Sequence, residues 1–127
     1  MNLLLDTHIF IWAFSDVARL PSAAAKALLD PQNSLFLSTA SSWEMQVKEQ
    51  IGKLVLSPSV EIFIKSQMLL NQIRPLPINN EHVWILRQLP LHHRDPFDRM
   101  IIAQAITEGL TIVTQDAFFA SYPVTIL

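Results

Sequence analysis

Four acidic residues could do chemistry together: Asp6, Glu44, Asp98 and Asp116. Asp6 directly follows the apolar run NLLL, and Asp116 comes two residues after TIVT. Glu44 falls in the first turns of the helix expected after SLFLS, and Asp98 in the first turn of the helix that precedes TIVT. Ligands of parallel sheets bind beyond the carboxyl ends of the strands, so we expect all four side chains to project toward that edge.

A cluster of this kind requires a cation. Two carboxylates about 5 Å apart repel each other by roughly 3 kcal/mol at an effective dielectric near 20. Four of them in one pocket need bound cations or raised pKa values. Oxygen donors without any cysteine suit Mg²⁺ or Mn²⁺. Such a site clamps a phosphodiester and activates water, with one metal or two.

Each acid also has a simpler interpretation. Asp6 could cap the first helix, and Asp116 could begin the last short helix. Glu44 precedes Lys48 by four residues, which is the favourable order for an ion pair on a helix surface. These alternatives account for the acids one at a time. They do not explain why four acids share one edge in a chain with 16% charged residues.

The segment HRDPFDRM contains two acids, one that fits a helix cap and one that belongs to the group of four. Asp95 before Pro96 predicts a helix N-cap with proline at the first helical position. Asp98 then occupies the third position of a capping box. We assign the start of the helix to Asp95, whereas Asp98 fits both a capping box and the acid cluster.

The alternation of short apolar strands with longer helical patterns predicts an α/β fold. The expected strands are 2–5, 34–38, 73–78, 111–114 and 124–127, and the expected helices are 8–14, 20–30, 39–52, 59–71, 79–89 and 96–108, with a short turn of helix around 116–122. Two prolines place the strand at 73–78 on the edge of the sheet. The order requires a mostly parallel sheet of four to five strands between helices, a three-layer α/β/α sandwich in one domain over 1–127.

Composition narrows the class of protein. The 50% apolar content is typical of a compact globular chain, and a mean hydropathy of +0.30 suggests a thoroughly covered sheet or a surface buried by a partner. A net charge of −2 argues against electrostatic coating of nucleic acid, so a nucleic-acid enzyme would have to concentrate its basic residues locally. The absence of cysteine favours a cytoplasmic protein. The sequence contains no run of about 18 apolar residues, so it predicts no membrane span.

Several other chemistries are excluded by missing motifs. The two glycines, Gly52 and Gly109, allow neither a P-loop nor a dinucleotide fingerprint, and no G-x-S-x-G elbow is present. The adjacent His92 and His93 lack helical metal-ligand spacing and are expected at the surface. Phospho-acceptor receiver domains and aspartyl-phosphate hydrolases need a late lysine, whereas the last lysine here is Lys65.

Four stretches resemble, in order, the four acidic motifs of the PIN domain: LLLDTHIFIW, SSWEMQVKEQIGKL, DPFDRMIIAQA and TIVTQDAFF. They cover nearly the whole chain, and together they are far more specific than any one alone. The closest likeness is to VapC-type toxins of bacterial toxin–antitoxin pairs. The resemblance implies an endoribonuclease that needs Mg²⁺ or Mn²⁺, with Asp6, Glu44, Asp98 and Asp116 as catalytic metal ligands.

The resemblance also implies supporting residues. Thr7, Thr114 and Asp95 would lie behind the ligands. The basic residues expected to hold the RNA backbone are Lys48, Lys53, Arg94 and Arg99. We expect a metal-activated water, not the ribose 2′-hydroxyl, to attack the phosphodiester.

Partners follow from the same resemblance. A VapC-like chain is expected to form a homodimer and to bind an antitoxin whose tail covers the crevice. Apolar side chains at Trp12, Phe14, Trp43 and Ile51 fit such contacts or a place in the core. Two alternatives stay open, an inactive PIN-like module that binds RNA or a protein, and a DNA nuclease with the same metal site.

Overall fold

The computed structural model describes residues 1–92 and 95–127, and the strands within them form one parallel sheet of five in the order β3-β2-β1-β4-β5. The strands are β1 (Asn2–Leu5), β2 (Ser34–Ser38), β3 (Ile73–Leu76), β4 (Thr111–Val113) and β5 (Thr125–Ile126). All four strand pairs are parallel. The proline-containing strand β3 lies at the edge, as its sequence predicts.

The helices follow the expected order. They are α1 (Thr7–Ser15), η1 (Val17–Arg19), α2 (Ser22–Leu29), α3 (Thr39–Gln50), α4 (Val60–Leu70), α5 (Asn80–Ile85), η2 (Leu86–Gln88), α6 (Pro96–Glu108) and η3 (Ala117–Ser121). The helix predicted over 79–89 is shorter than expected, because its second half is the 3₁₀ turn η2. The turn predicted around 116–122 is also 3₁₀.

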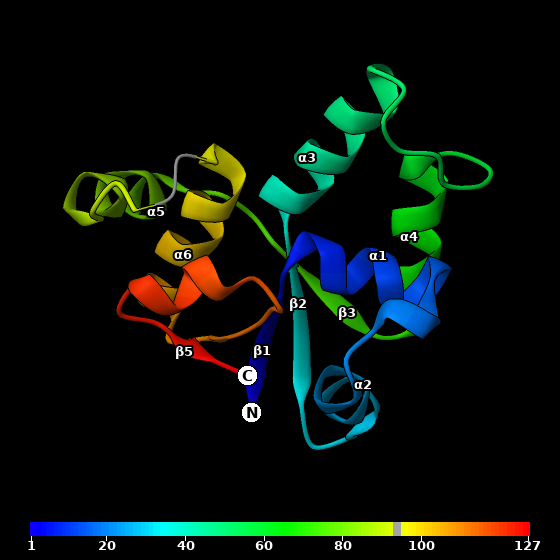
Figure 1. Cartoon of the computed structure of the whole chain (residues 1–127), viewed down its shortest axis with the longest axis horizontal. Helices are drawn as coiled ribbons and strands as arrows, with labels where there is room; N and C mark the ends of the chain where they lie inside the picture. Colours follow the sequence, from blue (N-terminus) through cyan, green and yellow to red (C-terminus); the bar gives the residue numbers. More distant parts are fainter. Residues whose placement is uncertain (93–94) are drawn as a thin grey trace.

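The sheet is covered on both faces, which confirms the three-layer sandwich. Leu3 and Leu5 belong to the apolar cluster that includes residues of α1, α2 and α4, whereas Leu4 belongs to the cluster formed with α6 and η3. Figure 1 shows α5 and α6 on one side of the strands and α1, α2 and α4 on the other. A strand buried on both faces reads as a continuous apolar run, which explains why NLLL shows no polar alternation.

Local signals in the sequence begin and end the helices. The Ser38 hydroxyl accepts a 2.9 Å hydrogen bond from the Ala40 N–H and caps α3 directly at the end of β2. Gly109 ends α6 in the left-handed conformation, with φ of 67°, which glycine adopts without the steric cost of a side chain. The starts of α1 and α3 therefore lie at the carboxyl ends of β1 and β2 (Figure 1).

A buried glutamine ties α6 to this edge. The Gln104 side chain is fully buried, accepts a hydrogen bond from the Ser38 hydroxyl and donates to the carbonyls of Leu76 and Pro77 at 3.3 Å. A buried amide of this kind is costly to leave unpaired, so these bonds fix α6 against the ends of β2 and β3. The first turn of α6 is thereby held in register with the first turns of α3.

Across residues 1–92 and 95–127, no helix combines the length and the apolar character needed to cross a membrane.

Candidate functional site

Asp6 and Asp116 line the same hollow at the carboxyl edge of the sheet. The Asp6 N–H donates to the Val113 carbonyl at 2.9 Å, so the segments that leave β1 and β4 start side by side. A hollow of about 390 Å³ opens there, lined by Asp6, His8, Trp12, Gln115 and Asp116. The predicted convergence of these two acids is thus visible in the structure.

Asp6 is a buried carboxyl with one hydroxyl partner. Its side chain is 3% exposed and accepts a 2.8 Å hydrogen bond from the Thr114 hydroxyl. Asp6 does occupy the N-cap position of α1 in an extended conformation, but its side chain makes no capping hydrogen bond, so a capping role does not account for this carboxylate.

The electrostatic surroundings of Asp6 favour a cation. Burial raises the pKa of the Asp6 carboxyl above its ordinary value of 3.8, and the negative charge of Glu44 acts in the same direction. The Thr114 hydrogen bond, the charge of His8 and the Thr7 N–H oppose this rise. A divalent cation would favour the charged form of the carboxyl and so offset the cost of its burial.

Glu44 is buried inside a network of polar groups. Its carboxylate receives a 2.7 Å ion pair from Lys48 on one oxygen and a 2.9 Å hydrogen bond from the Thr7 hydroxyl on the other. Ser41 lies 2.9 Å from that same hydroxyl. Because a carboxylate only accepts, the Thr7 proton goes to Glu44, and Ser41 in turn donates to Thr7.

This network confirms the predicted Glu44–Lys48 pair, but it differs from a surface pair. The Glu44 side chain is 4% exposed and that of Lys48 35%. Although Thr7 follows Asp6 in the chain, its hydroxyl donates its hydrogen bond to Glu44 and not to Asp6. Sequence reasoning did not single out Ser41, and nothing in the local sequence marks it, because its partner lies 34 residues away.

Asp95 caps α6, as predicted. Its carboxylate accepts from the N–H groups of Phe97 at 2.9 Å and Asp98 at 3.1 Å, with Pro96 as the first helical residue. The Phe97 ring packs edge-on against Trp43, with 4.9 Å between ring centroids. Because Trp43 precedes Glu44 and Phe97 precedes Asp98, this contact brings the turn that carries Asp98 beside the turn that carries Glu44.

Asp116 both caps the last short helix, as its simpler interpretation predicts, and lines the hollow. One carboxylate oxygen accepts from the Phe118 N–H at 2.9 Å and so begins η3. Its own N–H donates to the Thr114 hydroxyl at 3.0 Å. Thr114 therefore links Asp116 to Asp6, and the predicted supporting role of this threonine has a structural basis.

Among residues 1–92 and 95–127, no three acidic or histidine side chains stand close enough to form a ready-made metal cage. The donor set nevertheless fits Mg²⁺, which keeps several waters and commonly takes only one or two carboxylates. Asp6 and Glu44 meet that requirement as buried carboxylates that interact electrostatically. The four-acid ligand set stays a prediction.

The predicted RNA-binding residues occupy different surroundings. Lys48 is engaged with Glu44, and Lys53 is exposed beyond the end of α3. The Arg99 guanidinium donates to backbone carbonyls, including that of Pro90 at 2.8 Å, and so supports the loop before α6. Arg94 and the proposed surface residue His93 lie outside the described residues. RNA contacts by the lysines and by Arg99 stay predictions.

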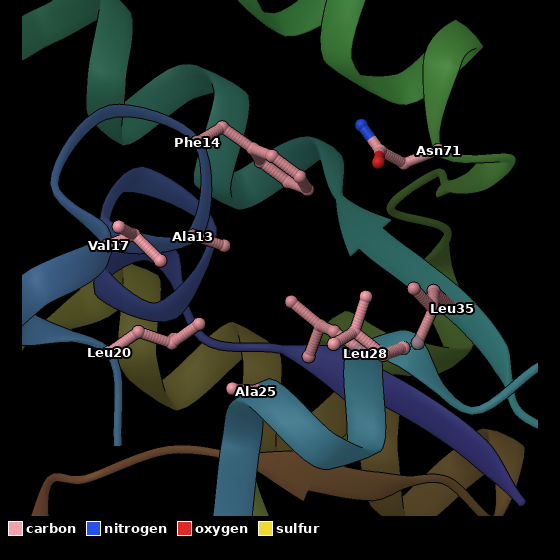
Figure 2. Close-up of a pocket in the computed structure, with 9 residues that line it drawn as sticks. Ala13, Phe14, Val17, Leu20, Ala25, Leu28, Leu35 and Asn71 are labelled. Carbon is pink, nitrogen blue, oxygen red and sulfur yellow. The ribbon is translucent and has the colours of Figure 1, made fainter. Parts of the chain in front are cut away.

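A second hollow, of about 190 Å³, lies away from the acids. Figure 2 shows its apolar wall, and the lining residues are Ala13, Phe14, Val17, Leu20, Ala25, Leu28, Leu29, Leu35 and Asn71. The amide of Asn71 is the polar side chain of this lining. None of these lining residues is acidic or basic.

Comparisons with known proteins agree with this arrangement. Residues 3–124 match the family model described as PIN domain. The ribonuclease VapC22 of Mycobacterium tuberculosis is 29% identical over 130 residues, and the alignment covers 98% of each chain.

Two solved structures show the same fold. VapBC2 from Rickettsia felis, bound to a DNA fragment from its promoter, superposes with a TM-score of 0.77 at 18% identity, covering 100% of this chain and 98% of the other. DNA-bound VapBC from Salmonella typhimurium superposes with a TM-score of 0.72 at 18% identity, covering 100% and 97%. These matches confirm the predicted α/β/α architecture over the whole chain.

Proposed function

The chain belongs to the PIN domain family, and from this premise we propose that it is a metal-dependent endoribonuclease and the toxin of a toxin–antitoxin pair. The observation that carries the proposal is the pair of buried carboxylates, Asp6 and Glu44, at the carboxyl edge of the sheet. The similarity of the chain to the ribonuclease VapC22 over nearly the full length supports RNA as the substrate.

The proposed cofactor is Mg²⁺ or Mn²⁺, held by Asp6, Glu44, Asp98 and Asp116. When bound, it supplies activation of a water nucleophile and neutralises charge on the phosphate. The four proposed ligands are all carboxylates, which favours a hard cation over zinc.

The chain's own hydroxyls orient the acids. Thr114 donates to Asp6, and Thr7 donates to Glu44, so each buried carboxylate has one oxygen held in place. Partners that orient metal ligands in this way contribute strongly to metal affinity and activity. Gln104 and the Asp95 cap hold the turn of Asp98 against the same edge.

Product chemistry tests the proposed reaction. Attack by water, not by the ribose 2′-hydroxyl, leaves a 5′-phosphate and a 3′-hydroxyl, so we expect these ends on single-stranded or loop RNA. The purified protein is incubated with RNA and with DNA of the same sequence, in Mg²⁺, in Mn²⁺ and in EDTA, and the ends are mapped. Asp6→Asn, purified in parallel, controls for contaminating nuclease because asparagine still accepts the Thr114 bond. A 2′,3′-cyclic phosphate, or equal activity in the variant, would rule the mechanism out.

The proposed partners are an antitoxin and a second copy of the chain. Trp43 and Ile51 are exposed, which fits a contact surface, whereas Trp12 and Phe14 pack partly into the core. Co-expression with a cognate antitoxin should give a complex that suppresses cleavage. Light scattering on the isolated chain should give the mass of a dimer, and a monomer at high concentration would contradict that part.

A further inference from the structure

The hollow beside Asp6 and Asp116 has an aromatic wall. His8 and Trp12 both line it, and both come from α1. They lie four residues apart and so share a helix face, with 5.6 Å between ring centroids and 36° between ring planes. Two π surfaces therefore stand directly next to two of the proposed metal ligands.

Two contacts support the Trp12 ring. Trp12 is half-buried and packs against the apolar core beneath α1. The Arg19 guanidinium lies 5.4 Å from the centroid of its ring, within the range of a cation–π contact. His8, by contrast, is exposed at the rim. The indole is thus a fixed surface and not a mobile side chain.

A flat, uncharged ring suits this hollow better than a phosphate does. The carboxylates of Asp6 and Asp116 repel an anion, whereas indole and imidazole rings stack with nucleobases of any sequence. Gln115, which also lines the hollow, offers an amide donor and an acceptor to the edge of a base. The volume of about 390 Å³ lies at the lower end of the range for small-molecule sites.

We propose that Trp12 and His8 form a stacking platform for the nucleobase next to the cleaved phosphodiester, with Gln115 at the edge of that base. This proposal rests on the proposed ribonuclease function. Arg19, which contacts the Trp12 ring, places a positive charge next to the platform. In a chain of net charge −2, such a local cation is what a nucleic-acid track requires.

The stacking is tested by a kinetic cycle in which the Trp12 side chain and the RNA base are removed singly and together. A cleaved RNA is compared with copies that carry a single abasic nucleotide, scanned across the cut site. At one position next to the cut, the wild type should lose roughly 5- to 150-fold in kcat/KM, the range expected for one stacked base. Trp12→Leu should lose the same factor on intact RNA and nothing further on that abasic RNA, and Trp12→Phe should recover most of the loss.

Matched controls separate stacking from folding. Trp84→Leu removes an exposed tryptophan on α5 and should leave kcat/KM unchanged. His8→Ala removes an exposed ring, so it should reduce kcat/KM without lowering the melting temperature, and the loss should be larger on RNA that has the base than on the abasic RNA. Additive losses in the cycle, or equal cleavage with an abasic nucleotide at every position, would overturn the proposal.

Fluorescence gives a readout independent of cleavage. The chain has three tryptophans, so Trp43→Phe with Trp84→Phe leaves Trp12 as the reporter. Adenosine carries no phosphate for the acids to repel, and it should quench Trp12 saturably. If the wild type cleaves no RNA but adenosine quenches Trp12, the nuclease proposal fails and base binding stands. If RNA is cleaved without quenching or kinetic coupling, the platform is wrong and the nuclease stands. If neither occurs, both proposals are wrong.

Discussion

Replacing Lys48 with methionine should destabilise the metal-free protein and strengthen its metal binding. Lys48 occupies one oxygen of Glu44 at 2.7 Å, at a carboxylate proposed to hold the metal. Methionine keeps the apolar stem of the side chain and removes the charge. Lys48 therefore acts as the counter-ion of Glu44 when no metal is present, and as a repelling charge when one is.

The expected magnitude follows from the exposure of the two partners. A charge separation of 2.7 Å gives about 6 kcal/mol at an effective dielectric of 20, before any cost of desolvation. Removing one partner of a fully buried pair costs about 3–5 kcal/mol, and exposed pairs are worth about 0–1 kcal/mol. Because Lys48 is 35% exposed and Glu44 4%, we expect the variant to lose about 1–3 kcal/mol of unfolding free energy.

Thermal melts with and without Mn²⁺ measure both effects. In EDTA the variant should melt lower, by about 4 °C per kcal/mol in a domain of this size. Added Mn²⁺ should raise its melting temperature more than that of the wild type, with a dissociation constant about tenfold tighter, equivalent to about 1.4 kcal/mol of relieved repulsion.

Lys65→Met is the matched control for this prediction. Lys65 and Glu61 have the same spacing and the same order on a helix, but both side chains are exposed. That variant should change neither the melting temperature nor the response to Mn²⁺. If Lys48→Met melts like the wild type in EDTA, or binds Mn²⁺ more weakly, Lys48 is not the counter-ion of the metal site.

Three further substitutions probe the acids and one hydroxyl. Asp98→Asn should nearly abolish cleavage and leave the metal-free melting temperature as high or higher, since a repelling charge is gone; retained ribonuclease activity would remove Asp98 from the ligand set. Asp6→Asn tests the raised pKa of Asp6: the folded state holds this proton more readily than the unfolded chain, so wild-type stability falls as pH rises from about 4 toward the folded pKa. The variant should therefore melt higher than the wild type at neutral pH, with the difference vanishing in acid, and a constant difference across pH would contradict the shift. Thr7→Val should reduce cleavage or Mn²⁺ affinity by about 10–100-fold through the loss of one bond to Glu44, and Thr107→Val, on the outer part of α6, should not.

Features encoded within a few residues could be predicted from the sequence. The Asp95 cap, the stop at Gly109 and the edge position of β3 each depend on neighbours in the chain, and the structure confirms all three. The assignment of hydroxyls to acids could not be predicted, because Thr114 meets Asp6 across 108 residues. His8 and Trp12 carried a usable signal, the four-residue spacing beside Asp6, which sequence reasoning left unused.

The simpler and the functional interpretations of these acids do not exclude each other. A buried carboxylate without a metal must have other partners, since an unpaired charge in the interior is very costly. Glu44 meets this need with Lys48 and Thr7, and Asp116 with the Phe118 N–H. Local partners of this kind hold the two side chains in place before a divalent cation binds. Within residues 1–92 and 95–127, Asp6 forms no ion pair, and burial raises its pKa, so it should gain most from that cation. The metal-dependent part of the stability should accordingly fall further in Asp6→Asn than in Asp116→Asn.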